Sequence, residues 1–419
     1  MTVLGKLSMG GGSAYLTNIT ATFSTKAVGA LIGLASSILA ARALGPEGRG
    51  LFATAATLAL IGMQFANVGL HSSNTYFLAQ DKTRLPNLIG NSVAASAILG
   101  SLAAGLIAAV AWAFGLAADL PHSLLGIALA IIPIGVAYML LSNLLLGLSE
   151  FTRFNAIEVG YRLVALALVA AAFAVGSQDA ATYLFTGLIA QALAVVAVWM
   201  SLGQPLSSMR TASVDLMRKQ APFAFRTYLN NLLGFILLRI DILMVQWFSG
   251  NAETGHYSIA VAMVDVIYML ATAAAQVMFP RLIAISAASE RKAATLRVLV
   301  EIGVGMAVFG LAASLVAAPA VNFFFGQSFL PAVPMFHILV PAILIYGMNT
   351  IVSNHLAAEG MPWHAVWVWA IGLFVNFALN LLLIPEYGGR GAACASLIGY
   401  SVVFAIQVWF VFGPKGRTA

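Results

Sequence analysis

Two basic residues, Lys26 and Arg239, stand in the middle of long apolar stretches of this sequence. A charge inside such a stretch is costly and usually faces a polar partner or a water-filled cavity. We expect Lys26, near mid-membrane, to face a water-filled cavity, and one of two alternatives for Arg239 places it in a cavity as well. The alternative for Lys26 is a helix-packing face, because Gly29 and Gly33 nearby form a close-approach motif and a lysine can extend to the membrane surface.

Uncharged polar residues recur at helical spacing in several other apolar stretches. Gln64, Asn67, His71 and Asn74 follow one another at three- and four-residue steps, so they share one face of a helix. Their amides can hydrogen-bond sugar hydroxyls, or they can join neighbouring helices. Asn230, in the stretch that holds Arg239, is a further candidate for substrate binding. We interpret a second set first as interhelical hydrogen bonds: Asn349, Ser353, Asn376 and Asn380.

Two carboxylates, Asp241 and Asp265, are candidates for ion coupling. Arg239 and Asp241 are two residues apart and point in nearly opposite directions on a helix, so each needs another partner. One reading is a structural ion pair between Arg239 and Asp265. The other is that Arg239 lines a cavity while a carboxylate takes up a proton or Na⁺. Glu158 and Arg162 have the four-residue spacing of an intrahelical pair.

These residues lie in a chain built almost entirely of membrane-spanning segments. Of its 419 residues, 61% are hydrophobic and only 8% are charged. Continuous apolar runs exclude an alternating β-barrel pattern and predict an all-α polytopic membrane protein. Twelve spans are expected, at about 15–42, 50–79, 87–115, 122–148, 152–175, 179–202, 220–248, 254–285, 294–318, 328–357, 362–384 and 389–412.

The distribution of Lys and Arg predicts the orientation of these spans. With the N-terminus in the cytoplasm, the outer loops receive only Arg42, Arg49 and Arg390, whereas most of the other basic residues fall on the cytoplasmic side. Cytoplasmic loops of membrane proteins carry this excess of positive charge. We therefore expect a multi-pass protein of the bacterial inner membrane with both termini in the cytoplasm.

The sequence also divides into two similar halves. The segment 45–52 resembles the segment 250–257, at an offset of 205 residues, and each follows the first long apolar stretch of its half. We expect an N-terminal six-helix lobe over 1–205, a cytoplasmic linker over 206–219 and a C-terminal six-helix lobe over 220–419. Repeats of six spans share their orientation, and such folds commonly bind substrate between the lobes.

Several kinds of chemistry have no support in the sequence. Cys394 is the single cysteine, so an internal disulfide or a cysteine-based metal site is excluded, and the six histidines lack metal-ligand spacing. No phosphate-binding Walker loop is present. We find no nucleophile and base in the loops, and the basic residues form no arm for nucleic acid. We therefore expect no catalytic residue, no enzyme activity, no metal and no cofactor beyond a coupling H⁺ or Na⁺.

Three motifs resemble one family over nearly the whole chain. The segment Ala41–Phe52 is similar to the first helix end of oligosaccharide flippases, the polysaccharide-transporter branch of the MATE-like superfamily. The segments Arg239–Val245 and 384–393 resemble the opening of that family's second half and the entry into its last helix.

This resemblance implies two bundles in a V around a central cavity that opens alternately to either side. It implies a polyprenyl-diphosphate-linked oligosaccharide as substrate, moved to the outer leaflet for cell-surface polysaccharide synthesis, with membrane lipids and polysaccharide polymerase or export machinery as partners. Lys26, Arg239 and, more weakly, Arg226 are the basic residues that the resemblance carries over.

Three other readings remain open. A MATE-type cation-coupled antiporter of drugs or metabolites shares the fold, but its first helix tends to hold an acidic residue where this chain has Lys26. A membrane-embedded glycan polymerase or ligase would predict a sizeable outer loop with Arg and His. A scaffold of an export complex would carry no transport of its own.

Overall fold

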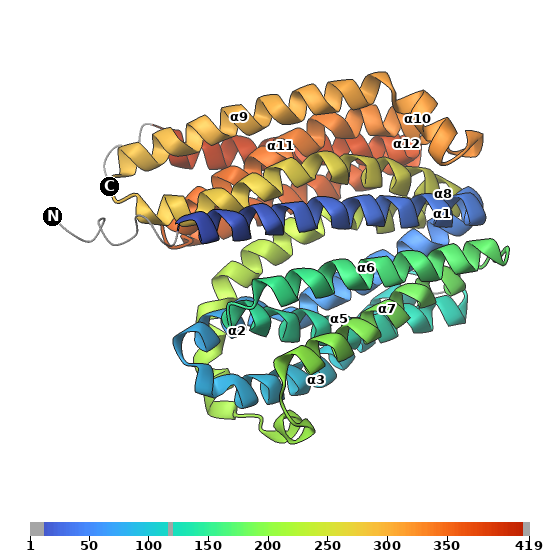
Figure 1. Cartoon of the computed structure of the whole chain (residues 1–419). Helices are drawn as coiled ribbons and strands as arrows, with labels where there is room; N and C mark the ends of the chain where they lie inside the picture. Colours follow the sequence, from blue (N-terminus) through green and yellow to red (C-terminus); the bar gives the residue numbers. More distant parts are fainter. Residues whose placement is uncertain (1–11, 116–119, 414–419) are drawn as a thin grey trace.

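The regular structure of the chain is helical throughout its described part. The computed structural model describes the backbone of residues 12–115 and 120–413, and the side chains within these ranges except those of residues 12–27, 221–224, 226, 227 and 280. The helices are α1 (Gly12–Asn67), α2 (Leu70–Gln80), α3 (Leu85–Ala113), α5 (His122–Gly147), α6 (Phe151–Ala174), α7 (Ala180–Leu202), α8 (Val214–Ala284), α9 (Ala288–Leu315), α10 (Ala317–Phe324), α11 (Ala332–Ala358) and α12 (Trp363–Phe412), with 3₁₀ turns at Lys82–Arg84, Leu206–Arg210 and Gln327–Phe329 (Figure 1).

Three of these helices are too long for a single crossing. In the described part of the chain, nine helices are long and apolar enough to span a membrane. Helix α1 alone has 56 residues, which is about 84 Å of straight helix against a hydrocarbon core of about 30 Å. It is interrupted at Gly45, and α8 and α12 are interrupted at Gly250 and Gly388, where φ is 62°, 78° and 56°. Each long helix therefore supplies two crossings, and the expected all-α fold with twelve spans is confirmed.

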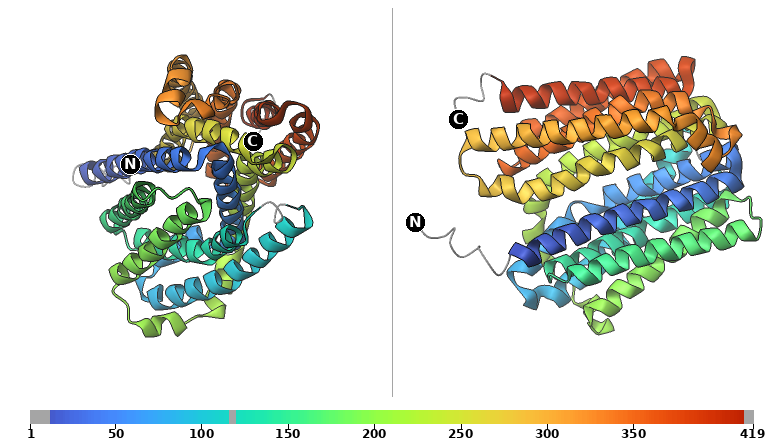
Figure 2. Two further views of the ribbon diagram at one scale, coloured as in Figure 1. Left: turned by 90° about the vertical axis from the view of Figure 1, so that its right-hand side faces the viewer. Right: turned by 45° about the horizontal axis from the view of Figure 1, so that its top comes forward.

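The crossings form two lobes. Figures 1 and 2 show α3, α5, α6 and α7 grouped on one side and α9, α11 and α12 on the other, with α1 between them. Each lobe has its own buried apolar core, around Leu58, Ile132 and Leu140 in the first and around Tyr257 and Phe336 in the second. Two packed bundles of this kind can move against each other without either core coming apart.

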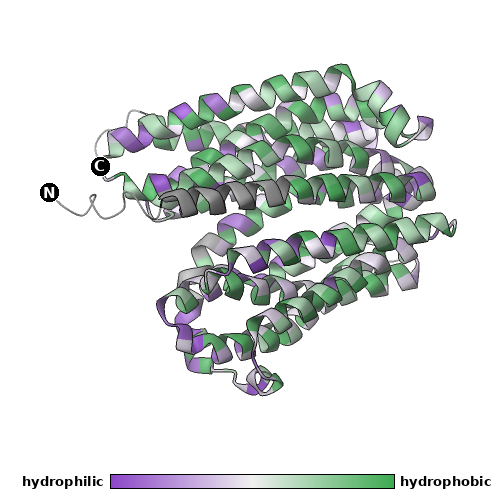
Figure 3. Ribbon diagram, in the orientation of Figure 1, coloured by the Kyte–Doolittle hydropathy of each residue, from purple (hydrophilic) through white to green (hydrophobic). Residues whose placement is uncertain are grey.

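The outer surface of both lobes is apolar. Figure 3 shows hydrophobic residues along the faces of most helices that point away from the bundle. Leu102, Val308 and Phe374 are 66%, 64% and 73% exposed. In water such a surface would be a large aggregation-prone patch, but in a bilayer it matches the acyl chains.

Helix α8 begins in the stretch that the sequence assigned to the linker. Ser213 caps its first turn by accepting the backbone N–H of Leu216, so the helix starts at Val214 instead of residue 220. The side chain of Asn91 on α3 holds this start in place: it accepts from the Ser213 N–H at 2.7 Å and donates to the Ser213 carbonyl at 3.2 Å. The described part of α8 thus begins on the N-terminal lobe and continues into the C-terminal lobe.

The two similar segments of the sequence contact each other at one end of the molecule. Gly50 lies so close to Asn251 that a Cβ at Gly50 would overlap the Asn251 carbonyl, and a Cβ at Gly255 would overlap the carbonyl of Pro46. Gly50 and Gly255 are equivalent in the two halves, as are Pro46 and Asn251, so the contact is reciprocal. It lies at the end farthest from the beginning of α1 (Figure 1).

Side-chain hydrogen bonds join the lobes around these two glycine turns. Thr54 Oγ1 donates to Gln246 Oε1 at 3.1 Å, and Arg49 Nε donates to Ser258 Oγ at 3.2 Å. Gln246 in turn donates to Asn251 Oδ1 at 2.7 Å. Sequence analysis placed Arg49 in an outer loop, whereas its side chain is only 7% exposed and joins the two lobes. The lobes are therefore held together at this end.

Alanine at Gly50 or Gly255 is expected to lower the free energy of unfolding by about 1–3 kcal/mol, the usual cost of overpacking. The added methyl meets backbone, which cannot rotate aside as a side chain can. Gly187→Ala on α7 is the matched control, because a Cβ there meets no atom within 4 Å. Thermal unfolding of the purified protein in detergent measures the effect, and unchanged melting temperatures for both turn variants would contradict this contact.

Candidate functional site

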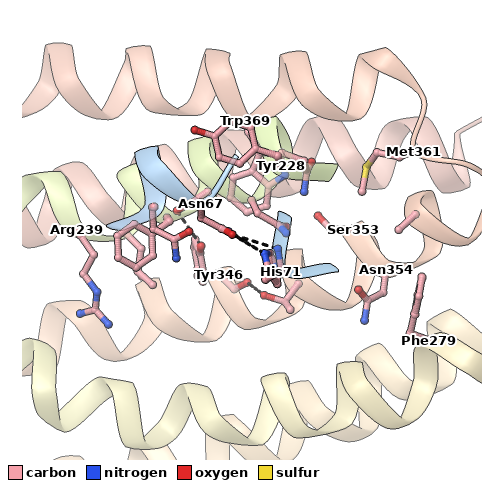
Figure 4. A pocket seen from close by; sticks show the side chains of 18 of the residues that line it. Asn67, His71, Tyr228, Arg239, Phe279, Tyr346, Ser353, Asn354, Met361 and Trp369 are labelled. Atoms are coloured by element: carbon pink, nitrogen blue, oxygen red, sulfur yellow. Dashed lines mark hydrogen bonds between the residues drawn. The ribbon is translucent and has the colours of Figure 1, made fainter. Parts of the chain in front are cut away.

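A cavity of about 620 Å³ lies between the two lobes. The N-terminal lobe contributes residues from the end of α1, from α2 and from α5, and the C-terminal lobe contributes residues from α8, α11 and α12. The lining residues are Gln64, Asn67, His71, Met139, Tyr228, Asn230, Asn231, Gly234, Phe235, Leu238, Arg239, Tyr268, Phe279, Tyr346, Thr350, Ser353, Asn354, Ala357, Met361 and Trp369. Figure 4 shows Arg239 at one end of the cavity and Asn354, Met361 and Phe279 at the other.

The cavity lies away from the glycine turns that join the lobes. On the part of α8 before Gly250 the cavity extends from Tyr228 to Arg239, and Arg239 precedes that turn by about 16 Å of helix; beyond the turn, Tyr268 and Phe279 also line it. On α11 it is lined from Tyr346 to Ala357, the half of the helix that ends at Ala358. The lobes are thus in backbone contact at one end and separated by the cavity toward the other, where hydrogen bonds from Tyr228 and Gln220 still attach the first part of α8 to the N-terminal lobe.

A break between α1 and α2 presents the polar residues of the N-terminal lobe. Val68 and Gly69 have φ of 38° and 78°, and a β-branched residue is rarely found in this left-handed region. Asn67 Oδ1 accepts the backbone N–H of His71 across the break at 3.4 Å, and the Asn67 amide lies within 2.8–3.0 Å of the His71 ring. Sequence analysis predicted one continuous span over 50–79, so the break corrects that prediction.

The wall of the C-terminal lobe is a row of aromatic rings. The ring centroids of Tyr268 and Tyr346 are 5.3 Å apart, and those of Tyr346 and Trp369 are 5.7 Å apart, both in edge-to-face geometry. The Tyr346 hydroxyl donates to the carbonyl of Gly234 at 2.9 Å, and the Tyr268 hydroxyl lies 3.1 Å from Thr350 Oγ1. Hydrogen bonds between α8 and α11 therefore hold Tyr268 and Tyr346, and Trp369 on α12 packs against Tyr346. Tyr346 and Trp369 could not be singled out from the sequence, because single aromatic residues occur on all faces of apolar helices.

Arg239 forms an ion pair, as one of the two sequence-based alternatives proposed. Its Nη2 lies 2.8 Å from Oδ2 of Asp265, and the two side chains are 19% and 34% exposed. Arg239 lines the cavity, whereas Asp265 is not among the lining residues. Its Nε is buried and has no hydrogen-bond partner.

Asp241 occupies a separate site in the core of the C-terminal lobe. It is 2% exposed, and its Oδ2 accepts from the Tyr257 hydroxyl at 2.5 Å and from Ser396 Oγ at 3.2 Å. Its Oδ1 accepts the backbone N–H of Ile242 at 2.9 Å. No basic side chain pairs with it among the described residues. As expected from their spacing, Arg239 and Asp241 have different partners.

The structure brings four of the proposed binding residues together. Gln64, Asn67, Asn230 and Arg239 line the same cavity, although they come from both lobes. Asn230 is 6% exposed, and its Oδ1 has no hydrogen-bond partner. The side chains of Lys26 on α1 and Arg226 on α8 lie outside the described residues.

Other polar residues inside the spans have structural partners. Arg162 and Glu158 form the expected intrahelical pair at 2.6 Å, and Tyr138 donates to the same carboxylate at 2.6 Å. Asn349 Nδ2 donates to the carbonyl of Tyr400 at 3.0 Å, which joins α11 to α12. Asn380 donates to Asn376 at 3.0 Å within α12. In the part of the chain that is described, no group of three or more His, Cys, Asp or Glu residues could hold a metal ion.

Comparisons with known proteins indicate both a family and a fold. Residues 15–286, more than half of the chain, match the family described as polysaccharide biosynthesis protein. An uncharacterized membrane protein of Methanocaldococcus jannaschii is 27% identical over 182 residues, which span 42% of this chain and 36% of that protein.

Solved structures share the fold at low sequence identity. The lipid II flippase MurJ in an inward closed conformation has a TM-score of 0.75 at 13% identity, over 94% of this chain and 87% of that chain. An inward-facing multidrug resistance MATE family transporter has a TM-score of 0.66 at 14% identity, over 93% of this chain and 96% of that chain. An outward-facing MATE family transporter has a TM-score of 0.59 at 15% identity, over 96% of this chain and 95% of that chain. The fold of this chain is therefore that of MOP-superfamily transporters.

A double-mutant cycle tests the ion pair. Arg239→Gln and Asp265→Asn should each destabilise the protein, because each leaves a partly buried charge without its partner. The double variant should be more stable than the sum of the single effects predicts, by about 1–2 kcal/mol of coupling. Thermal unfolding in detergent measures all four proteins. Strictly additive effects would mean that the 2.8 Å contact contributes nothing.

Proposed function

The chain belongs to the polysaccharide biosynthesis protein family, and from this premise we propose that it is a flippase for a polyprenyl-diphosphate-linked oligosaccharide. The substrate would cross from the cytoplasmic to the outer leaflet of the cytoplasmic membrane and serve cell-surface polysaccharide synthesis. The observation that carries the proposal is the cavity lined by amide, hydroxyl and aromatic side chains, between two lobes whose backbones pack against each other at the end away from it. Such a cavity can hold a hydrated head group while the lipid tail stays in the bilayer.

The proposed transport cycle is alternating access. With both termini in the cytoplasm, the glycine turns lie on the outer side and the cavity lies toward the cytoplasm, where the lipid-linked sugar is made. The higher similarity to the inward-facing than to the outward-facing MATE transporter is consistent with this orientation. Rotation of the lobes would separate the turns at Gly50 and Gly255 and open the cavity to the outside.

Two features support a role for Lys26 in binding the diphosphate. Arg239 is already paired with Asp265, so the charge of a diphosphate requires further cations. Lys26 and Asn231 each lie 19 residues before the turn glycine of their half, Gly45 and Gly250, and are thus equivalent in the repeat. Asn231 lines the cavity. The repeat therefore supports a Lys26 that faces the same cavity, and Arg226 is our weaker candidate for a second cation.

The lining of the cavity favours this substrate over a cationic drug. No described lining residue is an aspartate or glutamate, and the one lysine or arginine among them is Arg239. A cationic drug would lose its hydration there without gaining an anionic partner, which is unfavourable in a cavity of low dielectric. Amides and aromatic rings instead match hydroxyl groups and sugar rings.

Asp241 is our candidate for coupling transport to an ion gradient. Its carboxylate is buried and accepts three hydrogen bonds, but no described cation forms an ion pair with it. A buried carboxylate of this kind can gain a proton or Na⁺ from one side of the membrane. Because Tyr257 and Ser396 come from two other crossings, ion uptake would alter the contacts among three crossings of one lobe.

Transfer of a fluorescent polyprenyl-diphosphate oligosaccharide between the leaflets of reconstituted vesicles tests the flippase. The wild-type protein should accelerate transfer above empty vesicles, and Lys26→Ala should slow it about tenfold, through loss of about 1.4 kcal/mol of charge-assisted binding. Lys82→Ala, a surface change outside the cavity lining, is the matched control. Absence of transfer by the wild type would overturn the flippase, and unchanged transfer by Lys26→Ala would remove Lys26 from the site.

Asp241→Asn should remove the response of transfer to an imposed Na⁺ or proton gradient, because asparagine keeps the shape of the side chain but cannot take up the ion's charge. The rate of transfer measured without a gradient should change less than the additional rate that the gradient produces. Asp215→Asn at the exposed start of α8 is the control. The same assay, run with each gradient in turn, measures the effect. A variant that responds to the gradient as the wild type does would exclude Asp241 as the coupling residue.

A further inference from the structure

The lining of the cavity contains more sugar-binding than phosphate-binding chemistry. Among the described lining residues six are aromatic, five carry side-chain amides, and Arg239 is the one lysine or arginine; the aromatic and amide residues are Tyr228, Phe235, Tyr268, Phe279, Tyr346, Trp369, Gln64, Asn67, Asn230, Asn231 and Asn354. Aromatic faces suit the C–H-rich faces of pyranose rings, and amides both donate to and accept from hydroxyls. This set of groups is matched to an uncharged polar ligand.

Two buried polar atoms on the C-terminal lobe have no partner within the protein. Trp369 is 4% exposed and Asn230 is 6% exposed, and both line the cavity. The Trp369 Nε1–H donor and the Asn230 Oδ1 acceptor each lack a hydrogen bond. Buried polar groups without a partner are rare in folded proteins, and an ordered water or a ligand is one explanation for them. A sugar hydroxyl can accept from one and donate to the other.

Gly234 leaves room for a ligand beside Trp369. A Cβ at this position would lie 3.4 Å from the Tyr346 hydroxyl and 3.6 Å from the Trp369 ring, which is ordinary contact. Because the position holds glycine, that space remains part of the cavity. Gly234, Tyr346 and Trp369 come from α8, α11 and α12, so three helices of one lobe form this part of the wall.

The charge of the same wall disfavours an acidic sugar. Arg239 is paired with Asp265, so its positive charge is largely compensated. A uronic acid placed against the aromatic row would lose hydration without meeting a free cation among the described lining residues. Lys26 and Arg226, whose side chains lie outside the described residues, are proposed to bind the diphosphate.

We propose that this wall is a glycan subsite for uncharged pyranose units, with Trp369 donating to a ring hydroxyl, Asn230 accepting from one, and the row formed by Tyr268, Tyr346 and Trp369 supporting the ring. The proposal rests on the proposed flippase function and narrows its substrate to a glycan that is neutral where it meets the C-terminal lobe. It makes Trp369 and Gly234 specificity-determining positions.

Saturation-transfer NMR with free tetrasaccharides and the full-length protein in nanodiscs tests the subsite without the lipid or the diphosphate. The neutral probes are maltotetraose, cellotetraose and mannotetraose, and the acidic probe is tetragalacturonate. At least one neutral probe should bind, and any other neutral probe that binds should compete with it. Tetragalacturonate should bind at least fivefold more weakly than the best neutral probe. Equal or tighter binding of tetragalacturonate, or no binding of any neutral probe, would overturn the proposal.

Two variants connect the binding to this wall. Trp369→Phe removes the N–H donor and should weaken binding of the neutral probe about fivefold, which corresponds to one hydrogen bond of about 1 kcal/mol. Gly234→Ala fills the space beside Trp369, should fold at least as well as the wild type because alanine favours a helix, and should weaken binding by a similar factor. Trp409→Phe, at an exposed position on α12, and Gly187→Ala are the matched controls.

The outcomes separate this proposal from the flippase itself. Binding that is unchanged in Gly234→Ala and in a folded Trp369→Phe protein would place the glycan elsewhere and overturn the subsite, even if lipid-linked glycan is transferred. A protein that binds neutral glycans through Trp369 but transfers no lipid-linked glycan would retain the subsite and lose the flippase. Loss of binding in both variants but not in the controls supports the subsite directly.

Discussion

The close contact between the two glycine turns determines where the cavity can lie. Backbone approaches backbone at Gly50 and at Gly255, so the lobes cannot separate at that end without breaking both contacts and the hydrogen bonds of Arg49 and Thr54. The space between the lobes is therefore confined to the opposite half of the crossings. Because the contact is reciprocal between equivalent segments, it also defines the approximate symmetry about which one lobe can rotate against the other.

The cost of charge in a membrane explains the character of that cavity. A polar head group needs water and hydrogen bonds, but each unpaired charge in the wall would destabilise the protein. The chain meets both requirements with amides, hydroxyls and aromatic rings, and it compensates Arg239 with Asp265. Hydrogen bonds between uncharged groups are individually weak. A wall built from them can hold a substrate long enough to turn and still release it, which a transporter requires.

Sequence reasoning predicted the large-scale features because they follow from strong periodic signals. Twelve apolar stretches, the duplication of 45–52 in 250–257 and the separate partners of Arg239 and Asp241 all follow from length, spacing and charge. The break at Val68 was not predictable, because valine has no preference for the left-handed conformation and only the surrounding packing imposes it. Trp369 and Tyr346 were missed for a related reason: only tertiary contacts decide which face of an apolar helix meets the cavity.

The repeat also shows how the two lobes have come to differ. Lys26 and Asn231 are equivalent positions, yet one is a cation and the other an amide, and the position equivalent to Arg239 in the first half is Leu34. Most of the described cavity wall comes from the C-terminal lobe, whereas the N-terminal lobe contributes the short polar set of Gln64, Asn67 and His71. A symmetric scaffold can rock without binding anything. The unequal walls therefore suggest a division in which the scaffold provides the movement and mainly one lobe provides the recognition.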